Sequence, residues 1–277
     1  MRKLNTLSPF VAIMMTLGFL FLYIPIVLLI IFSFNESRLV TVWGGFSTKW
    51  YGTLMHNTQV LNATYLSLRI AAINATIATV LGTLAAIALV RFGRFRGRAL
   101  MNQMIASLLV MPEVILGLSL LLLFVSMQGA IGWPGQRGVL TILIAHATFS
   151  TAYVTILIQS RLAGMDRSYE EAAYDLGANA FTVFRTVTLP MIAPALVAGW
   201  LLAFILSFDD LVIASFASGP SATTLPMVIF SKVRFGISPE INALATIIVV
   251  TVAIFVVVAG LLLQRQSKQR LKAAGRG

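Results

Sequence analysis

The stretch IAAINATIATVLGTLAAIALV, residues 70–90, contains no charged residue and is followed at once by the basic turn RFGRFRGR, residues 91–98. At a rise of about 1.5 Å per residue, a helix of roughly 20 residues crosses the hydrocarbon core of a bilayer. Because no water is available there to bind the backbone amides, such a run is expected to be helical. The stretch therefore predicts a membrane-spanning helix that ends at a charged surface.

Five further runs without a charged residue are long enough to do the same. They cover residues 4–35, 114–136, 138–160, 186–208 and 241–264. The third of the six expected spans begins near Ala99, continues through Pro112 and Glu113, and ends near Gln128. Another uncharged run, residues 211–231, is broken by glycine and proline, so it is expected to be a helix end followed by an outer loop.

The composition agrees with lipid as the solvent. Of the 277 residues, 58% are hydrophobic and 10% are charged, and the mean hydropathy is +0.92. A soluble domain of this size would carry more charge on its surface. We therefore expect an all-α polytopic membrane protein with six transmembrane helices, forming one transmembrane domain over residues 1–277. Because the chain has no cysteine, disulfides, thiolate zinc sites and cysteine nucleophiles are excluded.

The distribution of lysine and arginine predicts the orientation in the membrane. Six helices place both termini on one side, which carries fourteen of these residues against five on the other, with Arg69 inside the second span. Because cytoplasmic loops carry the excess of positive residues, both termini are expected in the cytoplasm. The formal net charge of +11 then reflects short loops that flank helices, and it does not indicate a nucleic-acid-binding protein.

The connection between the fourth and fifth spans, residues 161–190, is much longer than the basic turn at 91–98 and carries all the acidic residues expected on that side. Long connections in compact proteins are usually functional. Ser168 followed three residues later by Glu171 matches a capping box, so a helix is expected to begin at Tyr169.

The second half of this loop carries further helix signals. Gly177 fits the left-handed position just past a helix end. Asn179 can cap a second short helix that runs to about Val187, and Pro190 is suited to open the fifth span because its missing N–H costs little there. The loop is therefore predicted to be a helix, a glycine turn and a second helix, lying parallel to the membrane surface.

The same residues carry a family resemblance. Glu171-Ala172-Ala173, Gly177, Val187 and Leu189-Pro190 stand at the spacing of the EAA loop of ABC importer permeases, with valine in place of the usual isoleucine. In that family the loop forms coupling helices that sit in a cleft of the ATP-binding subunit. The resemblance implies an ATPase-coupling role for Glu170, Glu171, Ala172, Ala173, Gly177, Leu189 and Pro190.

Nearly the whole chain resembles the polyamine permeases, and most closely the second membrane subunit of putrescine importers. The matching stretches are TVWGGFSTKWYG (41–52), RFGRFRG (91–97), MPEVILGLSLLLLF (111–124), IGWP (131–134), FDDLVIASFASGP (208–220), TTLPM (223–227) and PEINALAT (239–246). The resemblance implies a bacterial inner-membrane location and three kinds of partner: a homologous second permease, two ATP-binding subunits and a periplasmic polyamine-binding protein. It also implies that ATP and Mg²⁺ bind to the partner ATPase subunits and that this chain holds no cofactor.

Three acidic residues are candidates for contact with a polyamine. Glu113, Asp209 and Asp210 lie within or at the edge of spans, where ionisable groups are costly and usually functional. A polyamine is an elongated polycation, so a few separated carboxylates suit its passage. The alternative is a structural pair in which Arg69 neutralises Glu113 or Asp209. His146, in the fourth span, is expected to be a hydrogen-bonded residue of the helix bundle.

Other function classes have less support from the sequence. The chain contains no HExxH, GxSxG or GxxxxGK[ST] motif, so no catalytic or metal-ligating set is expected and the chain does not bind ATP for itself. An ion-coupled secondary carrier is the main alternative, although a long cytoplasmic loop and the lack of visible internal symmetry suit it poorly. The choice between putrescine and spermidine stays open.

Overall fold

The computed structural model describes residues 8–39, 42–235 and 239–254, and the regular elements among them are all helices. The predicted all-α class is confirmed. Internal contacts divide the chain into two units, residues 62–230 and residues 1–61 with 231–277. The helices are α1 (Pro9–Ser33), α2 (Lys49–His56), α3 (Thr58–Arg91), α4 (Arg98–Val110), α5 (Glu113–Ile131), α6 (Val139–Ala163), α7 (Ser168–Asp175), α8 (Ala180–Val183), the π-helix η1 (Phe184–Thr188), α9 (Leu189–Phe208), α10 (Val212–Ala217) and α11 (Leu225–Phe235).

Five helices in the described part of the chain are long and apolar enough to cross a membrane. They are α1, α3, α5, α6 and a continuous helix from Ala180 to Phe208. The sixth predicted span begins as the apolar helix Pro239–Ile254, and its remaining residues, 255–264, lie outside the described residues. Residues 4–7 of the first predicted span also lie outside them.

The third span differs from its prediction, because it is two helices rather than one. Met111 (φ −70°, ψ 129°) and Pro112 (φ −58°, ψ 133°) are both extended, so α4 ends at Val110 and α5 begins at Glu113. Proline has no N–H to continue the ladder, and it disfavours the helical conformation in the residue before it. The predicted passage of one helix through Pro112 is therefore wrong, and Glu113 lies at a helix N-terminus.

The predicted outer loop at 211–231 is also wrong in part. The structure has a short helix, α10, and then begins α11 at Leu225, with Pro226 as its second residue. Proline is well tolerated in the first turn of a helix, where its missing N–H has no partner to lose. The irregular segment is therefore limited to the residues between these two helices.

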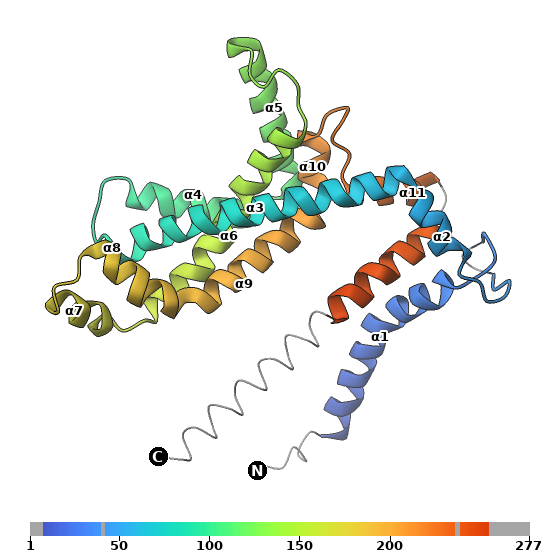
Figure 1. Cartoon of the computed structure of the whole chain (residues 1–277), viewed down its shortest axis with the longest axis horizontal. Coiled ribbons are helices and arrows are strands. Elements are labelled where there is room, and N and C mark those ends of the chain that lie inside the picture. Colours follow the sequence, from blue (N-terminus) through green and yellow to red (C-terminus); the bar gives the residue numbers. More distant parts are fainter. Residues whose placement is uncertain (1–7, 40–41, 236–238, 255–277) are drawn as a thin grey trace. The chain divides into compact units, whose positions relative to one another are not determined.

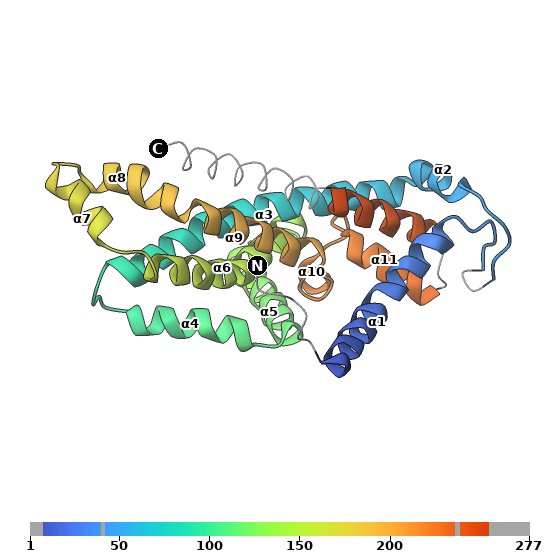
Figure 2. The ribbon, with the colours of Figure 1, turned by 90° about the horizontal axis from the view of Figure 1, so that it is seen from below.

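The unit formed by residues 62–230 is built on α3, α6 and α9, which run side by side (Figures 1 and 2). Val154 of α6 fits between two glycines: a Cβ added to Gly82 would lie 2.8 Å from its Cγ1, and one added to Gly199 would lie 3.2 Å from it. Asn74 joins all three helices, because its Nδ2 donates to Ser150 Oγ (3.0 Å) and to the carbonyl of Ala203 (3.1 Å). Small residues and interhelical hydrogen bonds are the usual means of packing helices in lipid.

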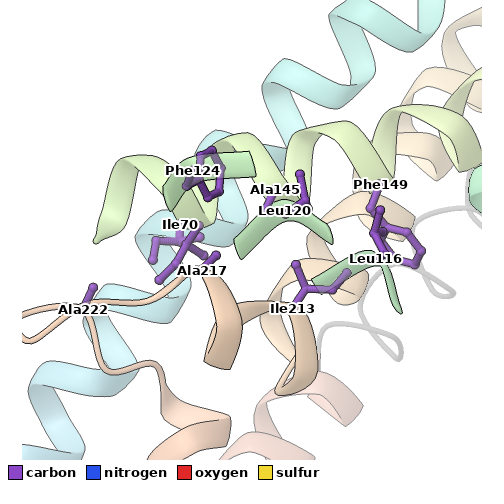
Figure 3. Packing of buried hydrophobic residues seen from close by; sticks show 10 residues of the cluster. Ile70, Leu116, Leu120, Phe124, Ala145, Phe149, Ile213, Ala217 and Ala222 are labelled. Atoms are coloured by element: carbon purple, nitrogen blue, oxygen red, sulfur yellow. The ribbon is translucent and has the colours of Figure 1, made fainter. Parts of the chain in front are cut away.

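A second cluster joins α3, α5, α6 and α10 in the same unit. Figure 3 shows the apolar side chains of this cluster gathered between the helices, among them Leu120 of α5, Ala145 of α6 and Ile213 of α10. α5 and α10 approach closely, since a Cβ added to Gly117 would lie 2.6 Å from the ring of Phe216. The short helix α10 thus packs against α5 at Gly117, where the absence of a side chain allows the close approach.

The unit formed by residues 1–61 and 231–277 is held by polar contacts near the ends of its helices. Trp50 of α2 is buried and donates its indole N–H to the carbonyl of Asn35 (2.6 Å). Glu240, also buried, accepts from Asn57 Nδ2 at 3.1 Å and forms an ion pair with Lys232. These contacts connect α2, α11 and the final described helix within the unit.

Candidate functional site

The loop between α6 and α9 has the predicted helix–glycine–helix arrangement. α7 runs from Ser168 to Asp175, and Gly177 follows it with φ +81°, which confirms the left-handed position. Asn179 Oδ1 accepts the N–H of Thr182 (2.9 Å), which confirms the predicted cap of α8. Figure 1 shows α7 and α8 at one end of the bundle formed by α3, α6 and α9.

The start of α7 differs from its prediction, because the helix begins at Ser168 and no capping box forms. Asp166 provides the cap instead: its Oδ1 accepts the N–H of Ser168 at 2.9 Å. This backbone hydrogen bond, assisted by the Ser168 hydroxyl, holds the pKa of the Asp166 carboxyl below its ordinary value. In a capping box the side chain of Glu171 would accept this N–H; Asp166, two residues before Ser168, accepts it instead, and the helix begins one residue earlier than predicted.

Pro190 lies in the first turn of α9, as predicted, but the second helix of the loop is not separated from that span. The helical path is continuous from Ala180 to Phe208, and the turn just before the proline is the π-helix η1. Pro190 offers no N–H, and its ring would press on the carbonyl one turn earlier in a regular α-helix. The wider π-turn relieves that crowding, and such turns occur frequently at functional sites.

Two adjacent glutamates in α7 differ in exposure and in their contacts. The side chain of Glu170 is only 12% exposed, and its Oε2 lies 2.9 Å from Nε of Arg91 at the end of α3. Its other oxygen, Oε1, accepts the hydroxyl of Thr188 in η1 at 2.7 Å. Glu171 is exposed and has no ion pair within the described chain. Of the predicted coupling residues, Glu170 is thus shielded and paired within the chain, whereas Glu171 is exposed at the edge of the same pocket.

The outward surface of the loop carries apolar side chains that no other described part of the chain covers. Leu176 is 90% exposed and Phe181 is 70% exposed, and Tyr169 and Tyr174 are about half exposed. Ala172 and Pro190 are exposed as well, whereas Ala173 and Leu189 are half-buried. We call the group of exposed residues Glu171, Ala172, Leu176 and Phe181 the loop face.

A pocket of about 420 Å³ lies between the loop and the end of α3. It separates α7 from the bundle, and α7 itself has no buried residue. The pocket is lined by Leu84, Ile87, Arg91, Phe92, Arg167, Glu170, Glu171, Tyr174, Ala180, Val183, Phe184 and Thr188. The charged side chains that cross this gap therefore make the main contacts of α7 with α3.

The second candidate region is the break between α9 and α10. The side chain of Asp210 is 7% exposed, and its Oδ2 lies 3.0 Å from Nε2 of His146 and accepts the N–H of Ala214 at 2.7 Å. The other imidazole nitrogen of His146 is 2.7 Å from the hydroxyl of Ser207. His146 is therefore a hydrogen-bonded bundle residue, as predicted. Asp210 is engaged by α6 and by the first turn of α10.

α6 holds the other end of α10 as well. The hydroxyl of Thr141 donates to the carbonyl of Ala217 (2.7 Å), and Arg137, just before α6, donates to the carbonyl of Phe216 (3.0 Å). These contacts satisfy carbonyls that have no partner within such a short helix. Figure 2 shows α10 beside α5, in agreement with the close contact at Gly117.

The remaining predicted pathway acids are exposed. Asp209 ends α9 and Glu113 begins α5, and both side chains are open. The alternative of a structural pair is not supported, because Arg69 forms no ion pair with either residue in the ranges that the structure describes. Those ranges also contain no group of three or more His, Asp or Glu side chains that could hold a metal ion.

Sequence reasoning missed the pairs Arg91–Glu170 and His146–Asp210. The second pair could have been anticipated from the depth of each residue in the membrane. His146 lies near the start of the fourth span and Asp210 just after the end of the fifth, so two antiparallel neighbouring helices would place both residues at the same depth. No comparable signal pointed to the first pair, because it depends on how α7 folds back against the end of α3.

Comparisons with known proteins identify the family of the chain. Residues 78–272 match the family described as "Binding-protein-dependent transport system inner membrane component". The chain is 59% identical over 265 residues to the "Putrescine transport system permease protein PotI" of Escherichia coli (strain K12), covering 96% of this chain and 94% of that protein. It is 44% identical over 254 residues to the "Spermidine/putrescine transport system permease protein PotC" of the same organism, covering 92% and 94%.

A solved structure shares the fold. It is a chain of a bacterial ABC transporter "involved in the import of the acidic polysaccharide alginate", with a TM-score of 0.68 at 19% identity, covering 91% of this chain and 94% of the other. At that identity the likeness concerns the fold alone. The family match covers well over half of the chain, and its relatives align over nearly their whole length. The chain therefore belongs to the family of binding-protein-dependent transport system inner membrane components, the permease subunits of ABC importers.

Proposed function

We propose that the chain is the non-catalytic permease subunit of an ATP-driven polyamine importer, with putrescine as the main cargo. The identity of 59% to a putrescine permease, against 44% to a spermidine/putrescine permease, supports this order of substrates. The whole chain, residues 1–277, acts as one transmembrane domain whose coupling loop is 161–190. Both termini lie in the cytoplasm of the bacterial inner membrane, which the excess of lysine and arginine on that side supports.

The loop face is the docking surface for an ATP-binding subunit. The observation that carries this proposal is the exposure of Leu176 and Phe181 on a face that the described chain leaves uncovered. Large apolar side chains gathered on an otherwise charged loop are typical of a protein–protein contact. Glu171, Ala172, Ala173 and Gly177 shape this surface, and Leu189 and Pro190 connect it to α9.

The importer consists of this chain, a homologous second permease, two ATP-binding subunits and a periplasmic polyamine-binding protein. ATP and Mg²⁺ are bound by the ATP-binding subunits, and this chain has no cofactor of its own. Glu113 and Asp209 line the polyamine pathway, and their exposure supports this because both carboxylates are open to a second permease or to a cation. Asp210 contributes to the pathway through its neighbour Asp209, since its own carboxylate is engaged by His146.

The test is purification of the tagged chain followed by transport in proteoliposomes. We expect an ATPase and a second permease to purify with it, and uptake to require ATP inside or outside according to the orientation of the complex. Labelled putrescine should be displaced by unlabelled putrescine more readily than by spermidine, and not by a neutral amino acid. Transport by the isolated chain without nucleotide would contradict the proposal and favour an ion-coupled carrier.

A further inference from the structure

α7 is attached to the rest of its unit mainly by polar side chains. None of its residues is buried, and a pocket of about 420 Å³ lies between it and the end of α3. Apolar packing therefore supplies little to hold this helix in place. The side chains that cross the gap are those of Glu170 and of Arg167, which comes just before α7.

These side chains connect α7 to two other elements. One oxygen of the Glu170 carboxylate forms an ion pair with Nε of Arg91, the last residue of α3 (2.9 Å), and the other accepts the hydroxyl of Thr188 in η1 (2.7 Å). Arg167 adds a second link to α3, because its Nη2 donates to the carbonyl of Val90 at 2.9 Å. The last turn of α3 is thus held at two successive residues, and η1 leads directly into α9.

The charges of Glu170 and Arg91 are each favourable for the helix end at which they lie. Glu170 lies in the first turn of α7, where the helix dipole favours an anion, and Arg91 ends α3, where it favours a cation. Both side chains are shielded from water, with exposures of 12% and 14%, so the pair is screened less than a surface ion pair would be. Removing one partner leaves a partly buried charge without compensation, which is more costly than losing an exposed pair.

We infer that Arg91, Glu170 and Thr188 form a clamp that transmits displacement of the coupling helix α7 to α3 and α9. This inference rests on the proposed docking of an ATP-binding subunit on the loop face. Glu170 acts as a positioning residue: it faces the bundle and not the partner, and its function is to make α7 and the two spans move together. Without the clamp, α7 keeps its exposed residues but is joined to the spans only by the hydrogen bond from Arg167 to Val90 and by short chain segments on either side.

The experiment compares Glu170→Gln with Asp175→Asn in the assembled importer. Both variants neutralise one acid of α7, but Asp175 is exposed and has no ion pair within the described chain, so it is the matched control. Three quantities are measured: the amount of ATPase subunit that purifies with the chain, the rate of ATP hydrolysis, and polyamine uptake in proteoliposomes. We expect Glu170→Gln to retain the ATPase subunit and to lower uptake per ATP hydrolysed by about tenfold, a typical size for a coupling energy. Asp175→Asn should leave all three unchanged.

Two further variants separate coupling from folding. Thr188→Val preserves the shape of the side chain and removes only one hydrogen bond, so uptake per ATP should fall less than in Glu170→Gln. The exchange Arg91→Glu with Glu170→Arg restores the pair with reversed sign, and it should recover part of the lost coupling although the helix dipoles then oppose both charges. Loss of the ATPase subunit in step with uptake, or no recovery in the exchanged pair, would overturn the clamp.

A variant of the loop face distinguishes the clamp from the docking proposal on which it rests. Leu176→Asp places a charge at the most exposed apolar residue of that face, and it should release the ATPase subunit from the complex. If it does so while Glu170→Gln transports normally, docking stands and the clamp fails. If Leu176→Asp retains the ATPase subunit and full uptake, the docking proposal itself fails.

Discussion

The chain contains two pairs of adjacent acids, Glu170-Glu171 in α7 and Asp209-Asp210 at the end of α9. In both pairs the two members have different environments. One member of each pair turns inward and is bound by its own chain, Glu170 by Arg91 and Asp210 by His146. The other member, Glu171 or Asp209, is exposed. The shielded acid fixes the local backbone, and the exposed acid is the one that we propose contacts a partner or a ligand.

The difference between the two pairs is in the partner of the inward acid. Glu170 meets an arginine, which is charged at every physiological pH, and joins three separate elements across a pocket. Asp210 meets a histidine inside a well-packed cluster and also caps α10 through backbone N–H groups. The first arrangement suits an element that is displaced as a body, and the second suits an element that stays in place.

Charge reversal of the outward glutamate should have the largest effect. Glu171→Lys places a cation on the proposed docking surface and in the first turn of α7, where the dipole disfavours it. We expect uptake to fall by about thirtyfold or more, which corresponds to about 2 kcal/mol at a protein interface. Membrane insertion should be unchanged, as measured by the amount of chain in the membrane fraction. Normal ATP-coupled uptake in this variant would remove Glu171 from the docking surface.

Replacing the shielded Asp210 should lower the stability of the fold more than it changes polyamine transport. Asp210→Asn breaks the pair with His146 and weakens the cap on α10, so we expect a loss of about 1–3 kcal/mol in the free energy of unfolding. Thermal unfolding of the chain in detergent measures it, with Asp209→Asn as the control for the same change at an exposed neighbour. Equal shifts of Tm in the two variants would show that the division into inward and outward acids is wrong here.

The sequence predicted the elements that depend on local chemistry. Gly177 and Asn179 were placed correctly, because a left-handed glycine and an N-cap amide act within a few residues of themselves. The uncharged runs likewise predicted the five spans found in the described part of the chain, since the thickness of a bilayer sets a minimum length that a run either meets or does not.

The errors arose where two local signals competed. Ser168 and Glu171 match a capping box, but the carboxylate of Asp166 accepts the backbone N–H of Ser168 that the Glu171 side chain would otherwise accept. Hydrophobicity favoured one span through Pro112, whereas the backbone preference of the residue before proline ended the helix at Val110. The inward contacts of Glu170 and Asp210 depend on tertiary packing, which residue spacing alone does not encode.

The outward aspartate should affect cargo and not stability. Asp209→Asn removes a negative charge from the proposed polyamine pathway, and we expect KM for putrescine to rise by about tenfold, the value of one charge-assisted hydrogen bond. Assembly with the other subunits should be unchanged, and Asp209→Glu, which keeps the charge, should recover most of the affinity. Uptake kinetics in proteoliposomes measure the change. Unaltered KM in Asp209→Asn would remove this residue from the pathway.

The smallest effect is expected at the cap of α7, which supports the inward–outward arrangement of the two glutamates. The pKa of Asp166 is lowered in the folded chain by its hydrogen bond from Ser168, so its contribution to stability is present above the unfolded value of about 3.9 and is lost as the pH falls through the lower folded pKa. Hydrogen exchange at the Ser168 amide should therefore accelerate in that acidic range, beyond the intrinsic change with pH. Asp166→Asn should abolish this acceleration while leaving uptake at neutral pH nearly unchanged, because Glu170 still holds α7 to the end of α3. A large loss of uptake in Asp166→Asn would mean that the cap, and not the ion pair, positions the coupling helix.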